Sequence, residues 1–292
     1  MYYIVYGVFY LMSLLPWRAL YILSDCIYPL LYYVIGYRKE VVMKNLAIAF
    51  PEKTEEERKQ IAKEFYKNFV DNFIETVKFI SISKEELSRR FTFDHESLNE
   101  LYKTGKNIQF TLGHFFNWEF ANLAYSAKLL YPFIVVYMPV ENKIFNRLFK
   151  KIRQRFGTHL VSATNFKNEF APYAKQQHAL ILVGDQSAMP DRGYWVDFFG
   201  KKTPFVKGPD RSARLNNAVV MFVNFYPVKR GYYNSEIVFY TANPRLCTEG
   251  EITKQMITFI EDTIRKHPSN YLWSHRRWKW EFDEAKYGKQ VI

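Results

Sequence analysis

A histidine and an acidic residue separated by four residues form the most chemically informative part of this sequence. His114 and Glu119 lie in the stretch Ile108 to Glu119, where an apolar run typical of a strand ends at Gly113 and an apolar-patterned helix follows. A histidine displayed between a strand and a helix is suited to general base catalysis. The segment therefore predicts a proton-transfer site.

The relation between these two side chains depends on where the helix begins. Five steps of about 100° along a regular helix separate side chains by roughly 140°, so helical periodicity alone does not bring them together. If Asn117 is the N-cap, Glu119 falls in the first turn and can reach back to His114, fixing its tautomer and stabilising the imidazolium. The alternative is a capping histidine beside an acid that interacts with the helix dipole.

Short strands and helices alternate along the rest of the chain. A helix begins at Thr54, which forms a possible capping box with Glu57, and a last amphipathic helix spans Glu251 to Lys266. The expected strands are Asn107 to Gly113, Phe133 to Tyr137, Ala179 to Gly184, Val219 to Phe225 and Ser235 to Tyr240. This alternation predicts an α/β fold with a mostly parallel central sheet flanked by helices.

A second acidic residue follows another expected strand. Asp185 and Gln186 come directly after Ala179 to Gly184, and sites in open α/β sheets gather beyond the carboxyl ends of the strands. We therefore expect Asp185 to border the same cleft as His114. A turn or a helix cap is the alternative interpretation of this dipeptide.

The N-terminal segment is strongly apolar. Met1 to Trp17 is one apolar stretch, and Ala19 to Gly36 is a second, interrupted by Asp25 and Pro29. Together they are too long and aromatic for an ordinary surface helix, which favours a membrane anchor or an interfacial hairpin over a pair of buried core helices. A cleaved signal peptide is not expected, because no positive residue precedes the first stretch.

The charge that follows this segment predicts its orientation. Positive residues gather from Arg38 and Lys39 onward, which places the following domain on the cytoplasmic face if the segment inserts. We expect an anchor over residues 1–37 and a single catalytic domain over residues 38–292.

The composition narrows the class of partner without choosing one. A chain of 292 residues with 48% hydrophobic residues can bury a substantial core, and its formal net charge of +12 predicts an anionic partner. Nucleic acid, an anionic bilayer surface, a phosphorylated lipid and an acidic carrier protein all fit.

Cys26 and Cys247 give neither a disulfide framework nor metal-ligand spacing. Without a Walker loop, a Gly-x-Gly-x-x-Gly turn or a zinc motif, no metal or other cofactor is expected.

Basic residues are concentrated in two segments. The helix expected from Asn142 to Phe156 carries Lys143, Arg147, Lys150, Lys151, Arg153 and Arg155, a pattern most typical of a solvated face. The C-terminal tail interleaves cations and tryptophans: Trp273, Arg276, Arg277, Trp278 and Lys279. This tail fits an interfacial belt, a nucleic-acid surface, or tryptophans packed in the core with the cations in water. Because no recognised nucleic-acid module accompanies it, no nucleic-acid partner is expected.

Several segments together resemble one enzyme family. They are Gly113 to Glu119, Val183 to Gln186, Phe198 to Gly200 with Thr203 and Gly208-Pro209, and Tyr271 to Lys279. In this order they resemble the bacterial lipid A biosynthesis lauroyl/myristoyl acyltransferases, the late acyltransferases related to the glycerolipid acyltransferases. The resemblance covers nearly the whole chain, including Gly36 to Arg38 and Asn45 to Pro51.

The resemblance implies a glycerolipid-acyltransferase-like fold and an O-acyltransferase at the bacterial inner membrane. The donor would be an acyl-carrier-protein thioester, and the acceptor a hydroxyl of a lipid A precursor. His114 and Glu119 would be catalytic, and Arg153 would bind phosphate or stabilise charge, which suits a guanidinium fork. Asp185 and Gln186 would belong to the substrate-binding part of the cleft. No covalent serine intermediate is needed, in agreement with the absence of a Gly-x-Ser-x-Gly elbow.

One position departs from the family pattern. The family often has Tyr-Arg-Pro where this chain has Tyr137-Met138-Pro139, so one expected contact to an anionic headgroup is missing. A lysophospholipid or an aminolipid is therefore the alternative acceptor. A basic membrane- or RNA-binding protein without enzymatic activity is a more distant alternative.

Overall fold

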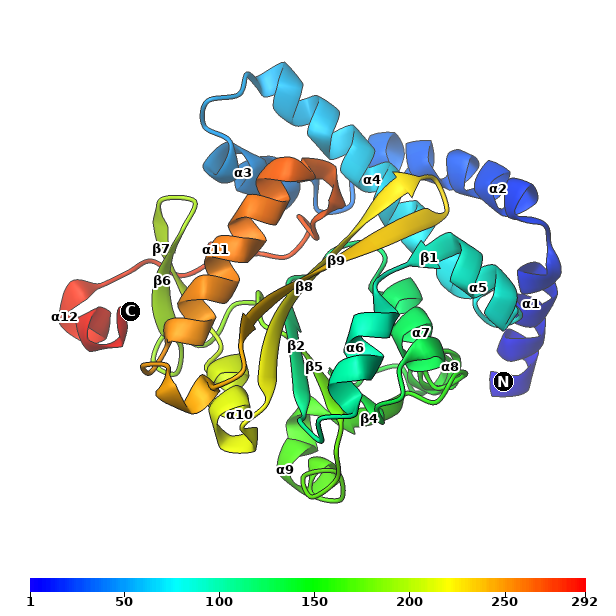
Figure 1. The fold of residues 1–292 in the computed structure, drawn as a ribbon. Helices are drawn as coiled ribbons and strands as arrows, with labels where there is room; N and C mark the ends of the chain where they lie inside the picture. The colour runs from blue at the N-terminus through cyan, green and yellow to red at the C-terminus, as the bar shows by residue number, and fades with distance from the viewer.

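A seven-stranded sheet with helices on both faces forms the centre of the computed structural model, which describes residues 1–292 (Figure 1). The strand order is β1-β9-β8-β2-β5-β3-β4, and every neighbouring pair is parallel except the β8–β9 hairpin. The strands are β1 (Phe91–Thr92), β2 (Ile108–Leu112), β3 (Phe133–Tyr137), β4 (His159–Ser162), β5 (Ala179–Val183), β8 (Val219–Lys229) and β9 (Tyr232–Thr241). The predicted α/β class with a mostly parallel sheet is confirmed.

Helices connect these strands and extend the fold at both ends. They are α1 (Tyr2–Leu14), α2 (Trp17–Pro29), α3 (Lys39–Ala49), α4 (Glu55–Lys78), α5 (Lys84–Arg90), α6 (His95–Tyr102), α7 (Trp118–Lys128), α8 (Lys143–Arg153), α9 (Phe166–Phe170), α10 (Gly208–Asn216), α11 (Glu251–Lys266) and α12 (Glu284–Tyr287), with the π-helix η1 (Leu30–Ile35) after α2. The helices expected from Thr54 and over Glu251 to Lys266 are confirmed, and Thr54 forms the predicted capping box with Glu57.

The two faces of the sheet are covered by different helices, as alternate residues of β2 show. Phe110 packs its ring against Tyr125 of α7, with ring centroids 5.4 Å apart. The preceding residue, Gln109, donates a hydrogen bond to the carbonyl of Pro209 in α10 on the other face. Successive side chains of a strand point to opposite faces. Burial on both sides explains why β2 is an apolar run without clean alternation.

The β8–β9 hairpin is longer than expected. Val219 to Phe225 and Ser235 to Tyr240 were the predicted limits, whereas the hairpin continues to a turn at Gly231, whose φ is +76°. The outer part of the hairpin leaves the core, since Val228 is exposed. An exposed pair of strands lacks the apolar pattern by which a strand is predicted from sequence. No strand is predicted from the sequence for β6 (Tyr194–Phe198) and β7 (Lys201–Phe205), which form a separate antiparallel pair.

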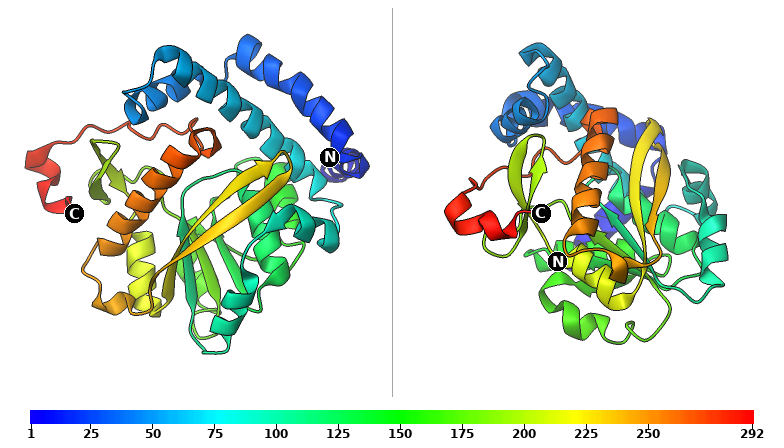
Figure 2. Two further views of the ribbon diagram at one scale, coloured as in Figure 1. Left: turned by 45° about the horizontal axis from the view of Figure 1, so that its top comes forward. Right: turned by 60° about the vertical axis from the view of Figure 1, so that its left-hand side comes forward.

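Helix α2 runs along α4 at one side of the sheet (Figure 2), and α1 turns away from it toward α8. The continuous helix Trp17–Ile35 has 19 residues, a mean hydropathy of 1.2 and only 17% of that stretch buried, which is long and apolar enough to cross a bilayer. The low burial argues against the alternative of buried core helices. The segment is nevertheless joined to the domain, because Leu20 packs on Val70 and Ile74 of α4. The division at residue 37 and the glycerolipid-acyltransferase-like fold stay predictions.

Candidate active site

The register between two parallel strands brings the predicted site residues together. In the pairing of β2 with β5, Leu112 lies opposite Val183, and the Gly184 amide continues the ladder by donating to the Leu112 carbonyl at 3.0 Å. His114 and Asp185 each stand two residues beyond this pair. Both therefore lie at the carboxyl edge of the sheet, where α/β proteins place their sites.

His114 and Asp185 form a close, doubly hydrogen-bonded pair. The His114 Nδ1 lies 2.5 Å from Asp185 Oδ1, and the His114 backbone amide donates to Asp185 Oδ2 at 3.0 Å. The Asp185 side chain is only 3% exposed, whereas that of His114 is 22% exposed. The carboxylate thus fixes the imidazole from the protein side and leaves the ring accessible to substrate.

The charge state of Asp185 suits this role. Burial raises the pKa of its carboxyl, but the interaction with His114 and the hydrogen bonds that it accepts outweigh burial and lower the pKa to about 2. Tyr271, a buried neighbour, adds a hydrogen bond in the same direction. Asp185 is consequently ionised at neutral pH, and its charge stabilises a proton gained by the imidazole.

Gln186 lies on the open side of the same ring. Its Nε2 is 3.3 Å from His114 Nε2. With Nδ1–H donating to Asp185, Nε2 is the acceptor nitrogen of a neutral imidazole, and the Gln186 amide donates to it. Nε2 is therefore the nitrogen available to take a proton from a substrate. His114, Asp185 and Gln186 thus lie together, as the sequence led us to expect.

Glu119 does not occupy the place that the sequence suggested. Asn117 caps α7 as expected, accepting from the amides of Glu119 and Phe120, but the Glu119 carboxylate accepts from Arg153 Nε at 3.0 and 2.9 Å and from its Nη2 at 2.5 Å. The expected contact between Glu119 and the imidazole is absent. The cap fixes Glu119 in the first helical turn facing α8, and Asp185 from the neighbouring strand takes the position at the ring.

Arg153 forms this ion pair with Glu119, and its side chain stays 19% exposed. Burial lowers the pKa of its guanidinium, but Glu119 raises it above the usual value. Trp118 connects the pair to the histidine: its indole N–H donates to Glu119 Oε1 at 3.2 Å, and its ring lies edge-on to His114 with centroids 6.0 Å apart. The Glu119–Arg153 pair thus borders the site through Trp118.

The C-terminal segment holds the His114 loop in place. The Leu272 amide donates to the His114 carbonyl at 3.0 Å, and the Phe116 amide donates to the Asn270 carbonyl at 3.0 Å. Asn45 of α3 fixes the same segment by donating to the Trp273 carbonyl at 2.8 Å. This support was not predicted, because hydrogen bonds between distant backbone segments leave no local pattern in the sequence.

The aromatic, basic tail is partly an internal structure. Trp273 is fully buried and Arg277 is 1% exposed, so the interpretation with packed tryptophans fits, but the expectation that all the cations stay in water is wrong for Arg277. Its guanidinium donates to Ser187 Oγ at 2.9 Å and to the Pro204 carbonyl, and lies 3.7 Å from the Phe205 ring centroid. Burial lowers the pKa of Arg277 to about 10. The charge consequently remains, and it lies near Asp185.

Comparison with known proteins gives one consistent result. A model of the family described as bacterial lipid A biosynthesis acyltransferase matches residues 1–280. The chain is 25% identical over 232 residues to a lipid A biosynthesis acyltransferase of Haemophilus influenzae, which covers 78% of this chain and 72% of that protein. It is 24% identical over 281 residues to the lipid A biosynthesis palmitoleoyltransferase of Escherichia coli, covering 94% and 89% of the two chains.

A third relative has the same coverage. The lipid A biosynthesis lauroyltransferase of Escherichia coli is 23% identical over 279 residues, which cover 94% of this chain and 89% of that protein. The family match spans the N-terminal helices, the His114 loop and the C-terminal segment alike. This chain belongs to the bacterial lipid A biosynthesis acyltransferase family.

Proposed function

We propose that this protein transfers a fatty acyl chain from an acyl-carrier-protein thioester to a hydroxyl of a lipid A precursor, on the cytoplasmic face of the bacterial inner membrane. Its family membership makes it an enzyme that transfers acyl groups in lipid A biosynthesis. The observation that carries the proposed chemistry is the His114–Asp185 pair, with the imidazole partly exposed and the carboxylate buried. The apolar helix Trp17–Ile35 supports the membrane location.

The proposed reaction needs one base and no covalent enzyme intermediate. His114 Nε2 takes the proton of the acceptor hydroxyl as the hydroxyl oxygen attacks the thioester carbonyl, giving a tetrahedral oxyanion. Asp185 stabilises the imidazolium that forms. Collapse of the intermediate breaks the carbon–sulfur bond, and the imidazolium returns the proton to the leaving thiolate. The products are an ester and a free thiol.

The remaining site residues have positioning and binding roles in this proposal. Gln186 donates to Nε2 in the resting site and is displaced by the acceptor hydroxyl, which it then contacts. Glu119 acts on catalysis by holding Arg153 and Trp118 beside His114. Arg153 keeps its charge next to the cleft and offers it to an anionic part of the substrate.

Thiol release in the presence and absence of acceptor tests this function. The purified chain, supplied with acyl-carrier-protein thioester, should release thiol and form ester only when the lipid A precursor is added. Thiol release without acceptor would indicate hydrolysis instead. Salt-dependent binding to membranes or RNA with no thioester consumption would support the non-enzymatic alternative.

A lysophospholipid or an aminolipid is the alternative acceptor, and Met138 is the observation that favours it. Met138 is 66% exposed and brings no charge to a position where the resemblance led us to expect arginine. The lipid profile of cells lacking the protein separates the two acceptors. Under-acylated lipid A is the expected result, whereas loss of a phospholipid or an aminolipid would favour the alternative.

A further inference from the structure

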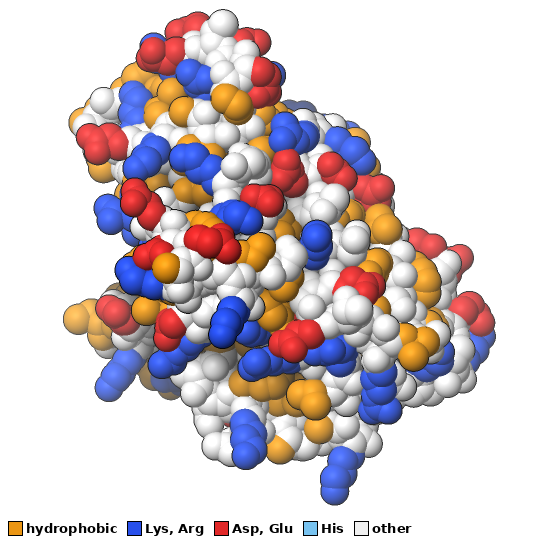
Figure 3. Space-filling model, turned by 90° about the vertical axis from the view of Figure 1, so that its left-hand side faces the viewer, with side chains coloured by type: hydrophobic (Ala, Val, Ile, Leu, Met, Phe, Trp, Pro, Cys, Tyr) orange, Lys and Arg blue, Asp and Glu red, His pale blue; other side chains and the backbone are white.

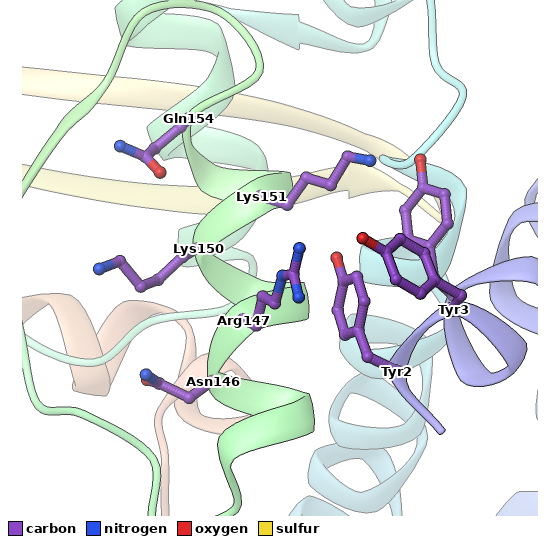
Figure 4. Close-up of a pocket in the computed structure, with 8 residues that line it drawn as sticks. Tyr2, Tyr3, Asn146, Arg147, Lys150, Lys151 and Gln154 are labelled. Carbon is purple, nitrogen blue, oxygen red and sulfur yellow. The ribbon is translucent and has the colours of Figure 1, made fainter.

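A cationic groove between the first helix and α8 lies outside the catalytic residues. It has a volume of about 780 Å³ and is lined by Tyr2, Tyr3, Tyr6, Asn146, Arg147, Lys150, Lys151 and Gln154. Arg147 and Lys151, one turn apart on α8, point toward the tyrosines of α1 (Figure 4). The groove therefore combines positive charge with phenolic hydroxyl groups.

The cations that line this groove form no ion pair with an acidic residue of the protein. The one ion pair on α8 is formed by Arg153, outside the groove. Arg147 lies 4.1 Å from the ring centroid of Tyr2, and Lys151 lies 3.9 Å from that of Tyr6. An aromatic face orients a cation but does not neutralise it. The groove thus remains able to bind an anion.

The position of α1 indicates where that anion comes from. At about 1.5 Å per residue, its 13 residues span roughly 20 Å, too short for a hydrocarbon core of about 30 Å. Ile4, Val8 and Leu11 follow one helical face and are exposed, whereas Tyr2 and Tyr6 lie on the opposite face, against α8. This arrangement is typical of a helix that lies in the membrane interface with its apolar face among the acyl chains.

We propose that the groove between α1 and α8 binds the phosphate of an anionic bilayer phospholipid. Headgroups surround the flanks of an interfacial helix, so a groove on the polar side of α1 opens at their level. Arg147 and Lys151 supply the charge, and the tyrosine hydroxyl groups donate to phosphate oxygens. The lipid's acyl chains lie beside the exposed face of Ile4 and Leu11. Binding there would fix α8, and with it Arg153, relative to the bilayer.

Charge on another face of the molecule is arranged differently. On the face shown in Figure 3, Lys and Arg side chains are scattered among acidic and apolar ones and do not gather in a single patch. Attraction of the whole basic molecule to an anionic surface would therefore not be confined to this groove, whereas binding of a specific headgroup would be. The experiment must accordingly separate local binding from net charge.

Titration of the full chain in a neutral detergent with a short-chain lipid makes this separation. Dihexanoyl phosphatidylglycerol is the probe, and dihexanoyl phosphatidylcholine is the zwitterionic comparison. We expect the wild-type chain to bind the anionic lipid at least about tenfold more tightly. This comparison needs no variant, and equal binding of the two lipids would overturn the proposal.

Two double variants with the same net charge test the location. Arg147→Gln/Lys151→Gln should weaken phosphatidylglycerol binding by about 10- to 30-fold. Lys106→Gln/Lys175→Gln removes two exposed cations that precede β2 and β5, at the amino edge of the sheet and opposite the edge that carries His114. This variant should leave binding unchanged. An equal loss in both variants would mean net charge alone, and unchanged binding in the first would exclude the groove.

Two further ligands distinguish other sources of negative charge. Inorganic phosphate should bind far more weakly than the lipid, and equal binding would reduce the groove to an anion site without lipid preference. Unacylated acyl carrier protein should bind Arg147→Gln/Lys151→Gln as it binds the wild type. If carrier-protein binding falls while phosphatidylglycerol binding does not, the groove is a protein-docking surface and the lipid proposal is wrong.

Discussion

At the scale of single residues, the histidine and the acid of the motif have different partners. His114 is bonded to Asp185, which follows another strand, and Glu119 is bonded to Arg153 on α8. The spacing of five positions therefore does not describe a direct pair. It places the histidine in the loop and the acid in the first turn of α7, where each meets a residue from elsewhere in the chain.

Replacement of Asp185 tests the corrected pairing. Asp185→Asn keeps the size of the side chain but removes the charge that stabilises the imidazolium, so turnover should fall by about 100- to 10,000-fold while the protein stays folded. Steady-state turnover with thioester donor and lipid acceptor measures this. The matched control is Asp191→Asn, an exposed residue six positions along, which should be active. Equal activity of the two variants would exclude Asp185 from the mechanism.

The Glu119–Arg153 pair predicts strong coupling between its two members. Glu119→Gln or Arg153→Met alone leaves a charged or polar partner unpaired in a largely buried site, at a cost of about 3 kcal/mol. The double variant removes both charges and should lose less stability than the sum of the single losses. Thermal unfolding of the four proteins measures the coupling. Strictly additive losses would indicate that the ion pair contributes no coupling energy.

At the scale of elements, the sequence predicted five strands of the central sheet, β2, β3, β5, β8 and β9, and missed β1, β4 and the separate pair of β6 and β7. The apolar runs of β2, β3 and β5 were predictable, and so was the meeting of His114 with Asp185 at one edge. The pairing of β2 with β5 and its register depend on tertiary packing. Because Glu119 and Asp185 are both acids near His114, only that register decides which one reaches the ring.

A buried carboxyl group on α4 supports the His114 loop from behind. Glu75 is fully buried and accepts hydrogen bonds from Tyr21 at 2.8 Å, from Asn117 at 2.8 Å and from Tyr233 at 2.7 Å. It thereby joins α2, the cap of α7 and β9. Burial raises the pKa of Glu75 from 4.5 to about 7, although the hydrogen bond from Tyr233 lowers it.

This raised pKa predicts a specific pH dependence of stability. Between pH 4.5 and about 7 the folded protein keeps the proton that the unfolded chain has lost, so Glu75 makes the free energy of unfolding fall as pH rises through this window. Glu75→Gln should lack that fall. In detergent, the thermal midpoint of the variant should rise relative to that of the wild type as the pH increases from 5 to 8. The exposed Glu52→Gln serves as control, and parallel curves for wild type and Glu75→Gln would contradict the assignment.

At the scale of the whole molecule, the net charge of +12 affects the rate at which partners associate with the protein and not the chemical step. Basic surfaces accelerate the association of acidic partners, and salt screens this effect. With an acyl-carrier-protein donor, kcat/KM should fall by about tenfold between 50 and 500 mM salt. A neutral acyl-pantetheine donor should show little change. The same salt dependence for both donors would remove the argument for an acidic protein donor.

The most direct test of the mechanism is the turnover of His114→Ala. The purified variant, assayed with acyl-carrier-protein thioester and lipid A precursor, should form ester about 100- to 10,000-fold more slowly than the wild type. His95→Ala, in α6, controls for loss of a histidine elsewhere, and the unfolding midpoint shows that the variant is folded. Ester formation near the wild-type rate in folded His114→Ala would contradict the role of His114 as the base.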